Sequence, residues 1–210
     1  MRHAAVAYFV DGRPVRPDTV TLTPAGLEQA RAAAAALAGV RLDRVLTSGL
    51  RRTLETAAIV APGAEPESWP DLRELESGRL ADFAEDELER AFVTAFKDIV
   101  PEEARFLGGE TIGSLYDRVL PALERLLADP AWDAVLAVLH GGVNRAILSH
   151  ALTGGRTFFG NLEQTPGCIN VLDAGEDWVV RAVNVTPYDL AHRRGRATTM
   201  EELWTEFRST

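Results

Sequence analysis

Arginine and histidine stand side by side near the start of the chain, as Arg2 and His3, and comparable polar groups recur at two later points. The stretch 47–52, TSGLRR, follows one apolar run, and His140-Gly141-Gly142 follows another. Guanidinium and imidazole groups suit an anion, and a neutral imidazole is also a nucleophile near physiological pH. Each group has a plainer explanation when taken alone. Arg2 and His3 could belong to a frayed terminus, and His140 could be a core-edge histidine satisfied by backbone.

The segments around these polar groups predict two strand-loop-helix units. The run DRVLTS at 43–48 has the length of a buried strand and precedes a helical pattern, and the apolar run Ala134–Leu139 precedes a helix from about Val143 to Leu152. Largely apolar strands that each feed a helix are typical of a parallel sheet covered on both faces. We therefore expect an α/β fold with its ligand site beyond the carboxyl ends of these strands.

The remaining patterns fit one domain over residues 1–210. Helical patterns run from about Glu85 to Lys97 and from about Thr111 to Asp129, and we interpret approximately 84–130 as a helical cap region. Two strands at 168–175 and 177–185 and a last helix at 199–209 complete the chain.

Composition limits the class of partner. The formal net charge of −9 disfavours nucleic acid, and no apolar run approaches the ~20 residues of a membrane helix. No secretory signal is recognisable, so a cytoplasmic protein is expected. The single cysteine, Cys168, excludes an intramolecular disulfide and a cysteine-rich metal site. We expect a small substrate.

The motifs occur in an order and spacing that resemble the histidine phosphatase superfamily, the phosphoglycerate mutase-like proteins. The resemblance spans nearly the whole chain, and its most specific part is the pattern S-x-L-x-R-x-x-x-T-A at 48–57. The matching stretches are RH at 2–3, TSGLRRTLETA at 47–57, LRELESG at 72–78, GGET at 108–111 and LHGG at 139–142. The resemblance implies a three-layer α/β/α fold with a mostly parallel central sheet.

The resemblance also implies a role for each matching residue. His3 is the nucleophile, Arg2, Arg52 and His140 form a phosphate pocket around it, and Glu74 protonates the leaving oxygen. Phosphoryl transfer depends mainly on positioning and on cationic stabilisation of the equatorial oxygens. Two arginines and a second imidazole can supply that stabilisation, so no metal and no cofactor are expected.

The sequence departs from the family pattern after His3. The family often reads Arg-His-Gly-Glu-Thr, whereas Ala4-Ala5-Val6 follow here, which adds a methyl group and removes polar groups near the pocket. Tyr8 and Phe9 make this edge apolar or aromatic, which suits a bulkier or less charged leaving group. Tyr8, Thr111 and Gly141 are the candidate substrate contacts.

The start of the chain conflicts with the family's usual arrangement. Family members place this Arg-His pair at the carboxyl end of a central strand, but only Met1 precedes it here. Residues 4–10 could form a strand, and His3 would then lie at its amino end, on the wrong side of the sheet. We expect either that the natural chain begins upstream or that the strand is truncated.

The expected activity is metal-independent hydrolysis of a small phosphomonoester through a phosphohistidine intermediate. One alternative is a phosphoglycerate mutase-type phosphotransferase, which the lack of an extra segment to hold a phosphorylated product disfavours. Another is a non-catalytic phosphoester-binding or interaction domain, which would have no evident use for the acid Glu74. The sequence predicts neither the physiological substrate nor the oligomeric state.

Overall fold

The central sheet consists of three short parallel strands. The computed structural model describes residues 1–10, 13–80, 83–193 and 197–209. Strand β3 (Arg44–Thr47) lies in the middle, between β4 (Glu67–Ser68) and β6 (Val135–Val138), and both pairs are parallel. Both apolar runs that predicted buried strands therefore form neighbouring strands of one sheet.

The first residues of the chain extend this sheet at β6. Arg2 forms a parallel bridge with Leu139. The amino group of Met1 donates to the Ala137 carbonyl at 2.6 Å, and the His3 amide donates to the Leu139 carbonyl at 2.9 Å. His3 therefore lies at the carboxyl end of a very short strand, on the same side of the sheet as His140.

Residues 4–10 do not form one continuous strand with His3 at its amino end. Within those residues only Phe9–Val10 forms a strand, β1, which pairs with β2 (Arg13–Pro14) in an antiparallel hairpin. The Ala4 and Ala5 amides instead donate to side chains, those of Thr56 and Gln29. These side-chain acceptors satisfy the backbone where no partner strand is present.

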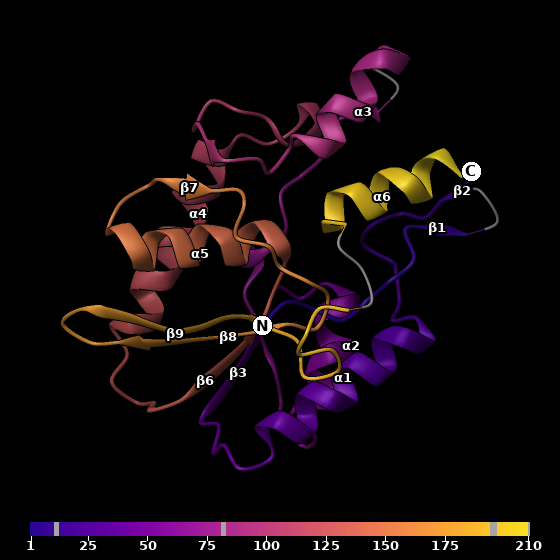
Figure 1. Cartoon of the computed structure of the whole chain (residues 1–210). Coiled ribbons are helices and arrows are strands. Elements are labelled where there is room, and N and C mark those ends of the chain that lie inside the picture. The colour runs from indigo at the N-terminus through magenta and orange to yellow at the C-terminus, as the bar shows by residue number, and fades with distance from the viewer. Residues whose placement is uncertain (11–12, 81–82, 194–196, 210) are drawn as a thin grey trace.

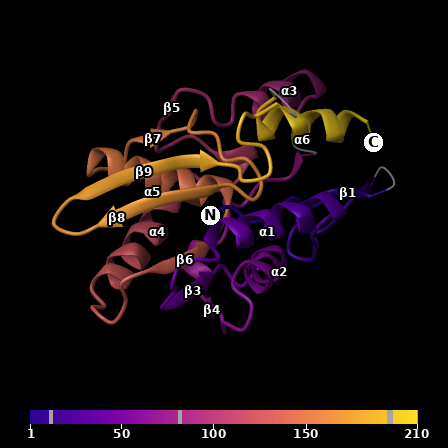
Figure 2. The ribbon, with the colours of Figure 1, turned by 60° about the horizontal axis from the view of Figure 1, so that its bottom comes forward.

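Helices cover both faces of the sheet (Figures 1 and 2). On one face, α1 (Pro24–Leu37) packs on α2 (Arg51–Val60), and their alanines and Val60 form an apolar core with β3 and β6. On the other face, α4 (Ile112–Leu127) and α5 (Gly141–Thr153) pack together with Leu139. The expected α/β/α fold class is confirmed by these layers.

The two helices expected within 84–130 lie in different places. Helix α4 belongs to the core beside α5, whereas α3 (Glu85–Val93) contacts α6 (Thr199–Arg208). Figure 1 shows α6, in yellow, between α3 and the β1 strand. Aromatic contacts join these elements, because Phe92 stacks on Phe207 and Phe9 meets the edge of the same ring.

The remaining elements are short strands and turns that border the core. An antiparallel pair, β8 (Ile169–Ala174) and β9 (Trp178–Val185), packs on α5, and β5 (Ile99–Val100) pairs with β7 (Phe158–Phe159). Single turns of 3₁₀ helix in the described ranges include η1 (Pro70–Leu72) and η3 (Phe106–Gly108). Within the described ranges, no helix is long and apolar enough to cross a membrane.

Candidate active site

Four of the predicted site residues form one buried cluster at the carboxyl ends of the strands. His3 follows the short first strand, His140 follows β6, and Arg52 lies in the first turn of α2, which follows β3. Their exposed fractions are 2%, 0% and 3%, and that of Arg2 is 7%. The two imidazole rings meet edge to face with their centroids 5.2 Å apart. The cluster is thus closed to solvent in this structure.

The hydrogen bonds of His3 define its tautomer. Its Nδ1 lies 2.8 Å from the Ala4 carbonyl oxygen, which can only accept, so Nδ1 carries the proton. The lone pair is then on Nε2, where the Arg52 Nε–H donates to it at 3.2 Å. Burial, followed by the charges of Arg2 and Arg52, holds the pKa of His3 well below its usual value. His3 is therefore neutral and presents a nucleophilic nitrogen to Arg52.

His140 is held in the opposite tautomer. Its Nδ1 lies 3.3 Å from Nη2 of Arg52, and because a guanidinium only donates, Nδ1 carries the lone pair. Its Nε2–H then donates to the Ser48 hydroxyl at 2.7 Å. Burial lowers the pKa of His140 most strongly, and the neighbouring His3 and Arg52 lower it further. Ser48, which lies within the S-x-L-x-R pattern, thus acts on the cluster through His140.

Arg2 is anchored by one end of its guanidinium. Nη1 donates to the Gln164 carbonyl at 2.5 Å and to the Thr199 hydroxyl at 2.9 Å. Nε is buried and has no partner among the described residues. An unpaired buried donor is costly, so this N–H is suited to an anion that enters the site.

Glu74 lies at the amino end of α5. Both of its carboxylate oxygens accept from the Gly142 amide, at 3.0 and 3.1 Å. A Cβ atom on Gly142 would lie 2.6 Å from Glu74 Oε1, so the close approach requires glycine there. A Cβ on Gly141 would lie 3.7 Å from Glu74 Oε2 and 3.8 Å from Arg2 Cζ. Gly141 therefore lies close to both the Glu74 carboxylate and Arg2.

Two of the predicted substrate contacts, Thr111 and Tyr8, make their described hydrogen bonds to other parts of the chain and not to the cluster. Thr111 caps the amino end of α4 by accepting from the Ser114 amide at 3.0 Å. Tyr8 is half-buried, and its carbonyl accepts from the Val15 amide. The neighbouring Phe9 ring packs on Phe207 of α6. The aromatic edge expected from Tyr8 and Phe9 is thus partly used in packing against α6.

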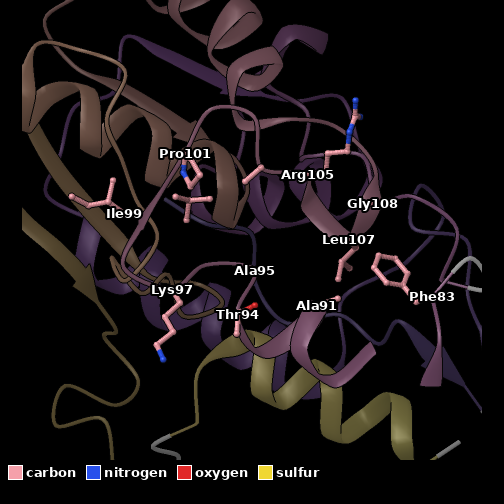
Figure 3. A pocket seen from close by; sticks show the side chains of 12 residues that line it. Phe83, Ala91, Thr94, Ala95, Lys97, Ile99, Pro101, Arg105, Leu107 and Gly108 are labelled. Carbon is pink, nitrogen blue, oxygen red and sulfur yellow. The ribbon is translucent and has the colours of Figure 1, made fainter. Parts of the chain in front are cut away.

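A polar hollow adjoins Glu74, and an apolar one lies apart from the predicted site residues. One of about 440 Å³ opens beside Glu74 and is lined mainly by polar residues, among them Arg73, Ser77, Glu110 and Arg118. The other, of about 270 Å³, lies between α3, β5 and η3; Figure 3 shows it, and its lining is largely apolar with Lys97 and Arg105. Only the first hollow includes a predicted site residue.

Sequence reasoning missed a second set of polar residues around Arg2. Arg145 donates from Nε to the Gly160 carbonyl and from Nη2 to Glu163. Its Nη1 lies 3.2 Å from the position of a Cβ on Gly141. Burial lowers the pKa of Arg145 to about 10. No spacing in the sequence connects Arg145 with Glu163 or Thr199.

Metal ligands do not cluster in the part of the chain that the structure describes: no group of three or more His, Cys, Asp or Glu side chains is arranged to hold an ion there. Cys168 is a free, buried cysteine that lies directly before β8.

Comparison with known proteins gives the family. Residues 1–186 match the model of the histidine phosphatase superfamily (branch 1). A probable phosphoglycerate mutase GpmB of Serratia proteamaculans (strain 568) is 36% identical over 72% of this chain and 73% of its own length. The metal-independent phosphoserine phosphatase of Arabidopsis thaliana is 32% identical over 70% of this chain and 65% of its own length.

A solved structure supports the fold. The alpha-ribazole phosphatase of Shigella flexneri superposes with a TM-score of 0.71 at 23% identity, covering 88% of this chain and 94% of that one. The phosphatase class expected from the sequence is confirmed together with the fold class. The chain belongs to the histidine phosphatase superfamily.

Proposed function

We propose that this chain hydrolyses a small phosphomonoester without a metal ion, through a phosphohistidine formed on His3. One observation carries the proposal: the lone pair of His3 Nε2 lies in the same buried cluster as the Arg52 donor and the unpaired Nε–H of Arg2. A nucleophile flanked by fixed cationic donors is what in-line phosphoryl transfer requires.

Substrate binding exposes the nucleophile. In the resting cluster Arg52 occupies the His3 lone pair and also donates from Nη1 to the Pro17 carbonyl at 2.6 Å. Phosphate oxygens are stronger acceptors for a guanidinium than an imidazole nitrogen, because the hydrogen bonds are charge-assisted. Arg52 turns to the phosphate, and Nε2 is left free to attack.

The first step transfers the phosphoryl group to His3. Nε2 forms a bond to phosphorus, the bond from phosphorus to the ester oxygen breaks, and the leaving oxygen takes a proton from Glu74. Glu74 must carry that proton when the substrate binds. Its position beside Gly141, near Arg2, supports this role, because it lines the polar hollow that can receive the leaving group.

The second step regenerates the enzyme. Water attacks phosphorus, gives its proton to the Glu74 carboxylate, and the bond between phosphorus and Nε2 breaks. Inorganic phosphate leaves, and His3 recovers its lone pair while Nδ1–H stays bound to the Ala4 carbonyl. Because Glu74 is an acid in one step and a base in the other, its proton is returned at the end of each cycle.

The relative that is named a metal-independent phosphoserine phosphatase supports hydrolysis without a metal. Because another relative is named a probable phosphoglycerate mutase, transfer of the phosphoryl group to a second substrate is the alternative that the test must separate from hydrolysis.

The test is release of phosphate from an aryl phosphate between pH 5 and 8, with a chelator present. His3→Ala is compared with wild type, and His150→Ala is the matched control because it removes an imidazole of α5 outside the cluster. We expect chelator-resistant release that His3→Ala abolishes and His150→Ala preserves, with phosphate trapped on the wild-type protein in an acid-labile form. Undiminished release by His3→Ala would overturn the proposal, and transfer to a second substrate without net release would favour the mutase.

A further inference from the structure

The hydroxyl of Thr199 joins helix α6 to Arg2. Thr199 is the first residue of α6, and its Oγ1 accepts from Arg2 Nη1 at 2.9 Å. The same hydroxyl donates to Glu163 Oε1 at 2.7 Å, and Glu163 Oε2 accepts from Arg145 Nη2 at 3.1 Å. A continuous series of hydrogen bonds therefore runs from α5 through Glu163 and Thr199 to Arg2.

This series occupies one end of the Arg2 guanidinium and leaves its Nε without a partner among the described residues. Nη1 is occupied by Thr199 and by the Gln164 carbonyl, whereas Nε is unpaired. An arginine binds an oxyanion best through two parallel N–H groups on one edge. With Nη1 held, the edge formed by Nε and Nη2 is the one left for a ligand.

Helix α6 is itself held in place by apolar contacts. Met200 is buried against Phe92 and Leu107, Phe207 stacks on Phe92, and the Trp204 ring contacts Phe92 at a tilt. Figure 2 shows α6 packed beside α3, on the side of the molecule where the C-terminus lies. The family match ends at residue 186, so α6 lies beyond the part of the chain that the family model describes.

We propose that Thr199 is a positioning residue for the phosphate pocket: its hydroxyl holds Arg2 by Nη1 so that Nε and Nη2 receive the anion. Helix α6 thereby supplies, together with the Gln164 carbonyl, the acceptors that hold Arg2. The inference rests on the proposed function, because it assigns Arg2 to phosphate.

The test compares three variants at the start of α6. Thr199→Val keeps the shape of the side chain and removes the hydroxyl, and Thr199→Ser keeps the hydroxyl. Thr198→Val is the matched control, because Thr198 caps the same helix end by accepting from the Glu201 amide and does not contact Arg2. Binding of inorganic phosphate is measured by calorimetry, KM and kcat are measured with an aryl phosphate, and thermal unfolding reports the fold.

We expect Thr199→Val to weaken phosphate binding about tenfold and to raise KM by a similar factor, as loss of one charge-assisted hydrogen bond predicts. Thr199→Ser should restore both values to within about twofold, since its hydroxyl can make the same two bonds. Thr198→Val should lower the unfolding temperature and leave phosphate binding unchanged.

Three results would overturn the inference. Wild-type phosphate binding by Thr199→Val would remove the role of the hydroxyl and leave the proposed function standing. Equal losses in Thr198→Val and Thr199→Val would mean that stability of α6, not the bond to Arg2, controls binding. Failure of the wild-type chain to bind phosphate at all would refute the proposed function, and the inference with it.

Discussion

Acidification should destabilise the folded chain through His3 and His140. Both rings are buried and neutral, and burial together with the nearby arginines holds both pKa values well below the ordinary 6.5. In the unfolded chain the same rings take up protons as the pH falls through 6.5. The unfolded state then binds more protons than the folded state, so the free energy of unfolding must fall below that pH.

The size of the effect follows from the depth of burial. A group that stays neutral when folded and titrates at 6.5 when unfolded contributes a loss of about 1.4 kcal/mol per pH unit below 6.5. Between pH 7 and pH 5 this amounts to at most about 2 kcal/mol for each ring and at most about 4 kcal/mol for the pair. Against a typical total stability of about 5–15 kcal/mol this is a large fraction.

Urea unfolding at pH 7 and pH 5, in buffers free of phosphate and sulfate, measures this loss. His3→Gln and His140→Gln should each reduce the difference between the two pH values by at most about 2 kcal/mol, whatever their effect on absolute stability. His150→Gln controls for the removal of an imidazole from outside the cluster. If both cluster variants kept the full wild-type difference, the two rings would not be neutral in the folded chain and the tautomers inferred above would be wrong.

Three substitutions test the parts of the site separately. Glu74→Gln should lower kcat/KM for an alkyl phosphate by about 10² or more, because the alkoxide leaving group needs a proton. It should lower kcat/KM for an aryl phosphate with an acidic phenol far less, because that leaving group does not need the proton. Equal losses on both substrates would contradict the role of Glu74 as acid. Gly142→Ala should reproduce that substrate dependence, because its Cβ would lie 2.6 Å from Glu74 Oε1 and displace the carboxylate; unchanged kinetics would show that the carboxylate need not stay there. Ser48→Ala leaves the Nε2–H of His140 without its acceptor and should lower the free energy of unfolding in urea by about 1–3 kcal/mol; an unchanged value would mean that Ser48 does not hold this ring.

The two strand-loop-helix units could be predicted because their patterns are local. Apolar runs of strand length predicted β3 and β6, and the structure places Arg44–Thr47 and Val135–Val138 within them. The second helix begins at Gly141, two residues earlier than expected. The residue before this helix, His140, makes no side-chain cap to it. The Glu74 carboxylate, from another segment, instead accepts a hydrogen bond from the otherwise unpaired Gly142 amide.

The residue pattern alone does not predict the first strand, because three residues are too few to show an alternation. Its place depends on bonds to distant segments: the Leu139 amide donates to the Met1 carbonyl, and the Arg2 amide donates to the Cys168 carbonyl. The same reason applies to Thr199. A single hydroxyl far along the chain has no spacing that links it to Arg2, whereas Arg52 was identified through a motif of several residues.

The resting cluster shows why binding and activation would be one event in the proposed mechanism. All three nitrogens of the Arg52 guanidinium already have acceptors, namely His3, His140 and the Pro17 carbonyl. A neutral ligand offers no stronger acceptor, so it would leave the His3 lone pair occupied. A phosphate dianion replaces neutral acceptors with charged oxygens and frees Nε2 at the moment when phosphorus is within reach. The arginine that stabilises the transferring group is therefore also the group that keeps the nucleophile occupied in its absence.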